Sequence, residues 1–263
     1  MAGKALYSQC EKSVLRAVEW EEGKVVDLVM GTYWYKLVVQ CSSGGKQKAV
    51  FADGKEHPYF EFARSPNDAV RYATNIVPVL PDGRFLMVVE QRGPHALYPE
   101  RPRVVGRANG KNIELGSYGS LEFPGGAIDP GDKSVSSGAL RELVEETGIQ
   151  DQTVSLFLKN TPVIAHGAGV ALGMKIAVVY LGSPNRAEWV FEDGVKMRTF
   201  ALTEEEIEGG LVSGAINSGQ AVCLGWQFYK DCIKVGKDEG RAIYRESLIR
   251  KGYITQLYTR VKV

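Results

Sequence analysis

The most informative stretch of this chain is FPGGAIDPGDKSVSSGALRELVEETGI, from Phe123 to Ile149, which holds most of the functional information. A turn rich in proline and glycine leads into a segment with helical periodicity, from about Lys133 to Thr147. At about 100° per residue, the glutamates of this helix gather on one side: Glu142, Glu145 and Glu146. The opposite side is mostly apolar: Ala139, Leu140, Leu143, Val144 and Thr147. The pattern predicts a helix that buries one face and presents three carboxylates on the other.

These carboxylates need a compensating positive charge. Glu142 and Glu146 lie four residues apart and repel each other, and only Arg141 is placed to offset them, through Glu145. Hard divalent cations take oxygen ligands, and Mg²⁺ is usually held by one or two carboxylates together with waters and substrate phosphates. The glycines of the preceding turn allow backbone groups to approach such an ion. The pattern therefore indicates a metal site, with a solvated acidic face as the alternative.

These residues resemble the signature of the Nudix hydrolases, which is a Gly, five residues, a Glu, seven residues, then Arg-Glu, an aliphatic residue, any residue, Glu-Glu, any residue, Gly and an aliphatic residue. The run from Arg141 to Ile149 matches the second half at every specified position. In the first half, Asp132 stands in place of the Glu, and eight residues instead of seven precede Arg141. Gly138 stands inside the helix, where family members more often carry Ala.

The resemblance implies Mg²⁺-dependent hydrolysis of a pyrophosphate bond in a nucleoside diphosphate derivative, with Mn²⁺ as a substitute metal. The metal ligands that it implies are Glu142, Glu145, Glu146 and the backbone carbonyl of Gly125. The implied catalytic residues are Glu145, Glu146, Arg141, which orients a carboxylate, and Glu192, a general base on a loop beyond the signature, with Glu188 and Asp193 as alternatives. The candidates for substrate binding are Arg92, Gly126 and Asp132.

Three further stretches resemble the ADP-ribose pyrophosphatase branch: VVEQR from Val88, LEFPGGAID from Leu121 and EEEIEGGLVSGAINSGQAV from Glu204. ADP-ribose, cleaved to AMP and ribose 5-phosphate, is the substrate that they imply. That branch often has a Pro where this chain has Ala165, and an acidic residue where it has GAGVAL from Gly167. The substrate within the nucleoside diphosphate derivatives therefore stays open.

The chain is predicted to have an α+β fold, an α/β/α sandwich with a mixed sheet. Residues 69–235 form the main domain, preceded by a β-rich unit at 1–68 and followed by a basic extension at 236–263. Short β-like segments predict a small antiparallel sheet in the first unit, which in the related branch commonly forms a homodimer. In the main domain, Pro81-Asp82-Gly83 predicts a hairpin turn between two strands. Further strands are expected at TVSLFLKN, KIAVVYL and VKMRTFAL, and a helix from Ala221 to Lys234.

Residues from Gly93 to Gly119 show neither helix nor strand periodicity and are rich in arginine, which predicts a long binding loop. A basic loop near the site suggests a larger substrate, either a dinucleoside polyphosphate or an RNA 5′ end. An alternative from another class of protein is a nucleotide- or RNA-binding protein that has the same fold but does not catalyse a reaction. Asp132 and the additional residue before Arg141 motivate that alternative.

The composition excludes several classes of protein. With 32 Lys plus Arg against 31 Asp plus Glu, the net charge of +1 gives no overall field toward nucleic acid or membranes. The four cysteines show no CxxC spacing, and the charged start of the chain lacks the apolar core of a signal peptide. No apolar run approaches the roughly 20 residues of a membrane-spanning helix. We expect an intracellular protein, in the cytoplasm, with no membrane contact.

Overall fold

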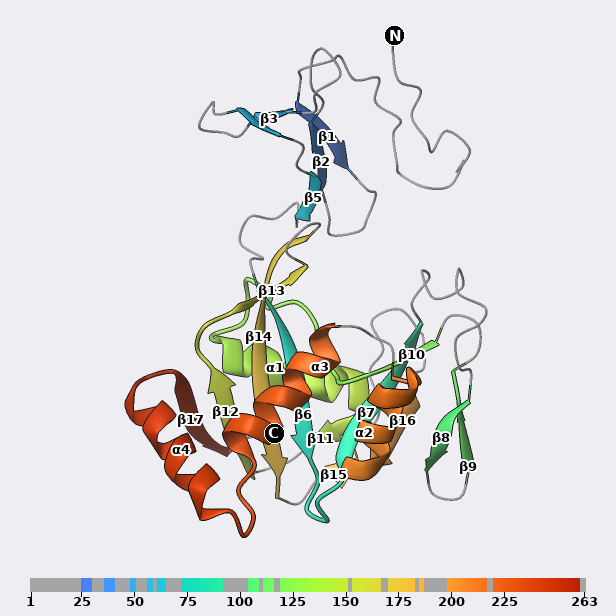
Figure 1. Cartoon of the computed structure of the whole chain (residues 1–263), viewed down its shortest axis with the longest axis vertical. Coiled ribbons are helices and arrows are strands. Elements are labelled where there is room, and N and C mark those ends of the chain that lie inside the picture. Colours follow the sequence, from blue (N-terminus) through green and yellow to red (C-terminus); the bar gives the residue numbers. More distant parts are fainter. Residues whose placement is uncertain are drawn as a thin grey trace. The chain divides into compact units, whose positions relative to one another are not determined.

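The structure is a computed structural model of the 263-residue chain. It describes residues 72–91, 111–115, 119–150, 153–166, 170–182, 198–216 and 220–260, and strands at 25–29, 36–40, 48–50, 56–58, 61–64, 104–108 and 185–186. The chain forms two compact units (Figure 1). One comprises Met1–Arg71 and Ile164–Gly173, and the other comprises Tyr72–Val163 and Met174–Val263.

The first unit contains the small antiparallel sheet that the sequence predicts. Three strands pair in antiparallel order: β1 (Val25–Val29), β2 (Lys36–Gln40) and β5 (Glu61–Arg64). A separate antiparallel pair is formed by β3 (Lys48–Val50) and β4 (Glu56–Pro58). Ala63 of β5 pairs in parallel with Val170, the first residue of β14 (Val170–Leu181). Strand directions are therefore mixed, as predicted.

The second unit is built on a sheet with the order β17, β12, β14, β6, β7. Their bounds are β6 (Tyr72–Val79), β7 (Phe85–Gln91), β12 (Thr153–Lys159) and β17 (Ile254–Arg260). β13 (Val163–His166) also pairs with β14, and β11 (Ile149–Gln150) pairs with β15 (Asn185–Arg186) apart from this sheet. Tyr72–Val79 and Phe85–Gln91 form the predicted hairpin. At its turn Gly83 has a φ of 84°, in the left-handed region that favours glycine.

Strand β7 positions the segment that leads to the candidate site. Val88 pairs with both Glu122 of β10 (Gly119–Glu122) and Thr199 of β16 (Arg198–Leu202), so these strands occupy its two edges. Phe85 pairs with Val79 of β6 and with Leu202 of β16, so β6 lies on the edge of β7 opposite β16. This is the edge that β10 also occupies. The chain therefore leaves β10 beside β6, where the proline- and glycine-rich turn begins.

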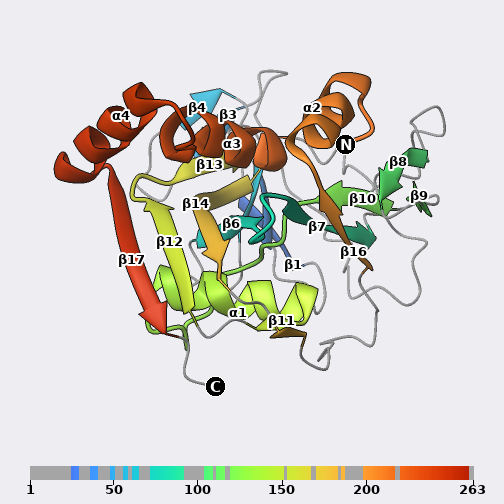
Figure 2. The ribbon, with the colours of Figure 1, turned by 90° about the horizontal axis from the view of Figure 1, so that it is seen from below.

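Helices cover both faces of this sheet, as Figure 2 shows. On one face lies α1 (Val135–Thr147). On the other lie α2 (Glu204–Ser213), α3 (Gln220–Phe228), the π-helical turn η2 (Tyr229–Ile233) and α4 (Glu239–Arg250). Alternate strand residues enter two separate cores, since Ile76 packs with the α1 cluster and Val77 with the opposite one. The α/β/α arrangement is the one predicted.

No helix in the described part of the chain combines the length and the apolar character needed to span a bilayer.

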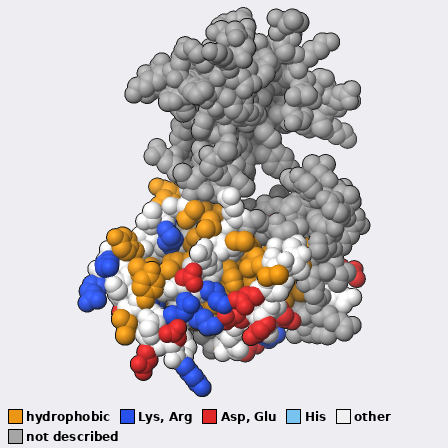
Figure 3. Space-filling view, viewed as in Figure 1, with side chains coloured by type: hydrophobic (Ala, Val, Ile, Leu, Met, Phe, Trp, Pro, Cys, Tyr) orange, Lys and Arg blue, Asp and Glu red, His pale blue; other side chains and the backbone are white. Residues whose placement is uncertain are grey.

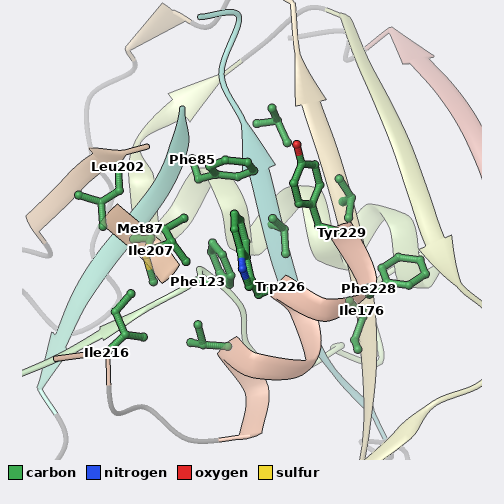
Figure 4. Close-up of a cluster of buried hydrophobic side chains, with 14 of the residues drawn as sticks. Phe85, Met87, Phe123, Ile176, Leu202, Ile207, Ile216, Trp226, Phe228 and Tyr229 are labelled. Carbon is green, nitrogen blue, oxygen red and sulfur yellow. The ribbon is translucent and has the colours of Figure 1, made fainter. Parts of the chain in front are cut away.

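An aromatic cluster fills the core beneath α3 (Figure 4). The rings of Trp226 and Tyr229 each meet Phe85 edge to face, with 4.9 Å between ring centroids. Phe123 stacks on Trp226 with centroids 6.4 Å apart. Pairs of this kind stabilise a core beyond the apolar area that they bury. Because Phe123 directly precedes Pro124, this cluster anchors the start of the turn at the candidate site.

On the face that carries α2, α3 and α4, Lys and Arg side chains lie beside Asp and Glu side chains (Figure 3). Glu204 accepts from Lys230 at 2.9 Å and from Lys234 at 2.8 Å. Lys230 also pairs with Glu208, and Arg241 pairs with Asp238 at 3.3 Å. These ion pairs join α2 to the end of η2 and hold the start of α4, so Lys230, Lys234 and Arg241 each have an acidic neighbour.

The stretch expected to lack strands contains a hairpin, which corrects that prediction. It consists of β8 (Val104–Ala108) and β9 (Lys111–Glu114), and Ile113 and Leu115 are buried in the core below α2. The guanidinium of Arg198 in β16 donates to the carbonyl of Glu114. Among the described residues of this stretch, Ile113 and Leu115 alternate with exposed neighbours, and so short an alternation is not recognised in the sequence.

Candidate active site

Both ends of helix α1 are capped, by Ser134 at its start and by Gly148 at its end. The side chain of Ser134 accepts from the backbone N–H of Ser137 at 3.1 Å, and the hydroxyl of Ser137 accepts from the N–H of Ser134 at 2.9 Å. At the other end Gly148 has a φ of 64°, and its N–H donates to the carbonyl of Val144 at 2.8 Å. The predicted start at Lys133 is two residues early, and the predicted end at Thr147 is confirmed.

The two sides of α1 differ as the periodicity predicts. Ala139, Leu143 and Thr147 are buried against the sheet, while Leu140 and Val144 are half-buried. The glutamate side is also partly covered, since the side chain of Glu142 is only 12% exposed and that of Glu145 is 32% exposed. The carboxylates therefore do not form a solvated face, because the turn before α1 lies against them.

This turn is fixed along β6 by backbone hydrogen bonds. The N–H groups of Thr74 and Ile76 donate to the carbonyls of Gly126 and Pro124 at 2.8 and 2.9 Å, and that of Ile128 donates to Tyr72 at 2.9 Å. A Cβ at residue 125 would lie 2.1 Å from the carbonyl oxygen of Thr74. The turn can lie this close to β6 only because residue 125 is glycine.

The same turn contacts two of the three glutamates. The N–H of Gly125 donates to Oε2 of Glu146 at 2.8 Å. A Cβ at residue 126 would lie 2.4 Å from Oε2 of Glu142, so Gly126 leaves the space that this carboxylate occupies. Both glycines that the sequence predicts for the site are therefore brought against its carboxylates.

Arg141 joins the remaining carboxylates. Its Nη1 donates to Glu142 at 2.9 Å and to Glu145 at 2.7 Å, and its Nη2 donates to Asp132 at 3.0 Å and to the carbonyl of Ala127 at 2.8 Å. Nε also donates to Asp132, at 3.2 Å. A planar guanidinium with five N–H donors suits such a set, which a lysine could not satisfy. These contacts fit the predicted role of Arg141 in orienting a carboxylate.

Burial and charge act differently on the two carboxyls beside Arg141. Burial raises the pKa of Glu142 to about 7, against the opposing effect of the Arg141 guanidinium and with a further rise from Glu145. Hydrogen bonds from Arg141 hold the pKa of Asp132 below its usual range. A positive charge near Glu142 would therefore favour its ionised form, whereas Asp132 is ionised already.

The donor set suits a hard divalent cation, although it is not arranged as a complete site. In the ranges that the structure describes, no three His, Cys, Asp or Glu side chains are gathered to hold a metal. Glu142 and Glu145 turn toward Arg141, and Glu146 turns toward Gly125. Because Mg²⁺ usually takes only one or two carboxylates besides waters and substrate phosphates, these oxygens fit such an ion.

Other predicted site residues are not tested by this geometry. Arg92 and Glu192 lie outside the described residues, so their roles in substrate binding and as a general base stay predictions. Asp132 has both oxygens occupied by Arg141 and the N–H of Asp129. The contact between Asp132 and Arg141 was not predicted, because it depends on the path of the turn between them.

Comparison with known proteins adds a family match. Residues 71–184 match the model of the NUDIX domain, which confirms the resemblance seen in the signature. No curated protein matches the chain in a sequence comparison. Among solved structures, the chain is similar to a crystal structure of an ADP compounds hydrolase, with 18% identity and a TM-score of 0.48, covering 89% of this chain and 100% of that chain.

Proposed function

We propose that this chain, a member of the Nudix hydrolase family by its domain at residues 71–184, hydrolyses the pyrophosphate bond of a nucleoside diphosphate derivative. The observation that carries the proposal is the packing of the α1 carboxylates against the glycine turn. Glu142, Glu145 and Glu146 lie within one partly buried group, linked by Arg141 and Gly125. A merely solvated acidic helix would need neither the arginine nor a glycine packed against the carboxylate of Glu142, as Gly126 is.

A divalent cation, Mg²⁺ or its substitute Mn²⁺, would be held by Glu142, Glu145 and Glu146, with the carbonyl of Gly125 as a further ligand. Such an ion neutralises charge on phosphate oxygens and lowers the pKa of a bound water. Such an ion would also favour the ionised form of Glu142, whose pKa burial raises to about 7. The catalytic carboxylates in the proposal are Glu145 and Glu146, and Arg141 keeps Glu142 and Glu145 in place.

For the substrate we propose ADP-ribose, cleaved to AMP and ribose 5-phosphate. The support comes from the sequence stretches around Val88, Leu121 and Glu204. In this proposal Arg92 binds a phosphate of the substrate and Glu192 accepts the proton of the attacking water.

The test is product analysis on a panel of ADP-ribose, other nucleotide sugars, NAD, dinucleoside polyphosphates and capped RNA, each with Mg²⁺ and with Mn²⁺. We expect cleavage of ADP-ribose, and a loss of at least about 100-fold in kcat for Glu145→Gln and Glu146→Gln. Glu205→Gln, on the exposed start of α2, is the matched control and should keep the parent rate.

Three other outcomes are informative. Preferred cleavage of a dinucleoside polyphosphate or capped RNA would replace ADP-ribose by the larger substrate. Tight nucleotide binding without turnover under any condition would support a binding protein instead of an enzyme. Equal rates for the parent and the two Gln variants would contradict the role of α1.

A further inference from the structure

The carboxylate of Asp132 lies directly against the first turns of α1. Its side chain is only 8% exposed. Both of its oxygens accept from Arg141, at 3.2 and 3.0 Å, and Oδ2 also accepts from the N–H of Asp129 at 2.8 Å. The carboxylate is thus held from two sides, by the helix and by the turn, and has little freedom to move.

Gly138 provides the space for this carboxylate. A Cβ at residue 138 would lie 2.7 Å from Oδ2 of Asp132 and 2.8 Å from Cδ1 of Ile128, both closer than real Cβ contacts. The methyl of Ile128 is the free end of a flexible side chain and can turn away. The Asp132 carboxylate cannot do so without losing Arg141 or Asp129.

Glycine at residue 138 lowers the stability of α1, so another property of this position must favour it. Inside a helix, glycine is less favourable than alanine because it loses more backbone freedom on folding. Gly138 is the fourth residue of α1 and is buried, and its N–H makes the first bond of the helix, to the carbonyl of Ser134 at 3.1 Å. Alanine would be the better helix former there if the only requirement were a stable α1.

We propose that Asp132 and Gly138 form one positioning unit, in which the missing side chain at residue 138 admits the carboxylate that holds Arg141 against Glu142 and Glu145. Gly138 is then a positioning residue that touches no substrate. The inference rests on the proposed function, in which those glutamates hold the cation.

The first test is a double-mutant cycle on activity, with Gly138→Ala made in the parent and in Asp132→Ala. In the parent, Gly138→Ala should lower kcat by roughly 10- to 100-fold, as is usual when a residue that orients a metal ligand is lost. The KM should change much less, because neither residue contacts substrate in the proposal. In the Asp132→Ala background the same change should alter kcat less than about twofold, since the carboxylate that it displaces is gone.

The second test measures thermal unfolding and needs no activity. In Asp132→Ala, Gly138→Ala should raise the Tm by about 2–4 °C through helix propensity alone. In the parent this gain should be absent, because the new methyl displaces Asp132. Gly209→Ala is the matched control, since this exposed glycine lies within α2 and a Cβ there would meet nothing within 4 Å. It should raise the Tm equally in both backgrounds and leave kcat unchanged.

A third measurement is titration with Mn²⁺ alone, in which Gly138→Ala should weaken binding by roughly 10-fold or more. Equal Tm gains for Gly138→Ala in the two backgrounds, or additive losses of kcat, would overturn the proposal. If the parent cleaves nothing on the substrate panel, the proposed function fails by itself. The Tm cycle then still decides whether Asp132 and Gly138 act together.

Discussion

Gly125 shows how the absence of one side chain places a whole site. The sequence suggests that this glycine lets the backbone approach a ligand. The structure shows that the close approach is to the protein itself, because a Cβ would lie 2.1 Å from the carbonyl of Thr74. The same residue donates its N–H to Glu146. Packing of the turn on β6 and orientation of a site carboxylate therefore depend on the same position.

This contact predicts that Gly125→Ala destabilises the fold. The obstructing atom is a backbone carbonyl of a central strand, which cannot rotate away, so the turn must move from β6. Overpacking of this kind costs about 1–3 kcal/mol. Urea unfolding of the variant measures that cost. Gly131→Ala is the control, because a Cβ there would meet nothing within 4 Å. Equal stability of the two variants would contradict the close packing.

At the scale of elements, periodicity predicts those helices and strands whose environment is uniform along their length. α1 is one of them, since its buried residues Ala139, Leu143 and Thr147 recur every four positions and its ends carry capping residues. The partners of Arg141 could not be predicted in full, because Ala127 and Asp132 reach it through the path of the turn. The helix α2 was not predicted, since only Ile207 and Gly210 of its residues are buried and its apolar period is weak.

The ion pairs of Glu204 with Lys230 and Lys234, which connect α2 to η2, predict that the stability of the fold depends on pH. Burial raises the pKa of Glu204, but hydrogen bonds from Lys234 and Lys230 outweigh it, so the pKa falls below its usual 4.5. A lowered pKa stabilises the fold above pH 4.5, and this contribution disappears as the pH falls through the lowered value.

We therefore expect Glu204→Gln to lose at most about 1 kcal/mol of unfolding free energy at pH 7, because these groups are partly exposed to solvent. The loss should shrink steadily below pH 4.5 toward pH 2. Thermal unfolding at several pH values measures it, with Glu205→Gln, an exposed neighbour on α2, as the control. A Tm difference between Glu204→Gln and the parent that stays constant from pH 7 to pH 2 would contradict the ion pairs.

At the scale of the whole molecule, the sheet with helices on both faces follows from its apolar strands. Within β14, Ile176 and Val178 enter one core while Ala177 and Val179 enter the other, so a continuous apolar run marks a strand covered on both sides. The order of the strands could not be obtained in this way. The pairing of β17 with β12 joins residues about 100 positions apart, and no local pattern encodes such a partner.

The pairing of β17 bears on the segment at 236–263, for which the sequence predicts a separate basic extension. Seven residues of β17 pair with β12, and Ile254 is 3% exposed within the core that also holds Trp226. Ile254→Ala should therefore cost about 2–4 kcal/mol of unfolding free energy, as other buried truncations do. Tyr258→Ala, at a side chain that is 78% exposed, should change it by less than about 0.5 kcal/mol. Urea unfolding of the full chain measures both. A separate extension would give small effects for both variants, whereas a strand that completes the domain core makes only Ile254 costly.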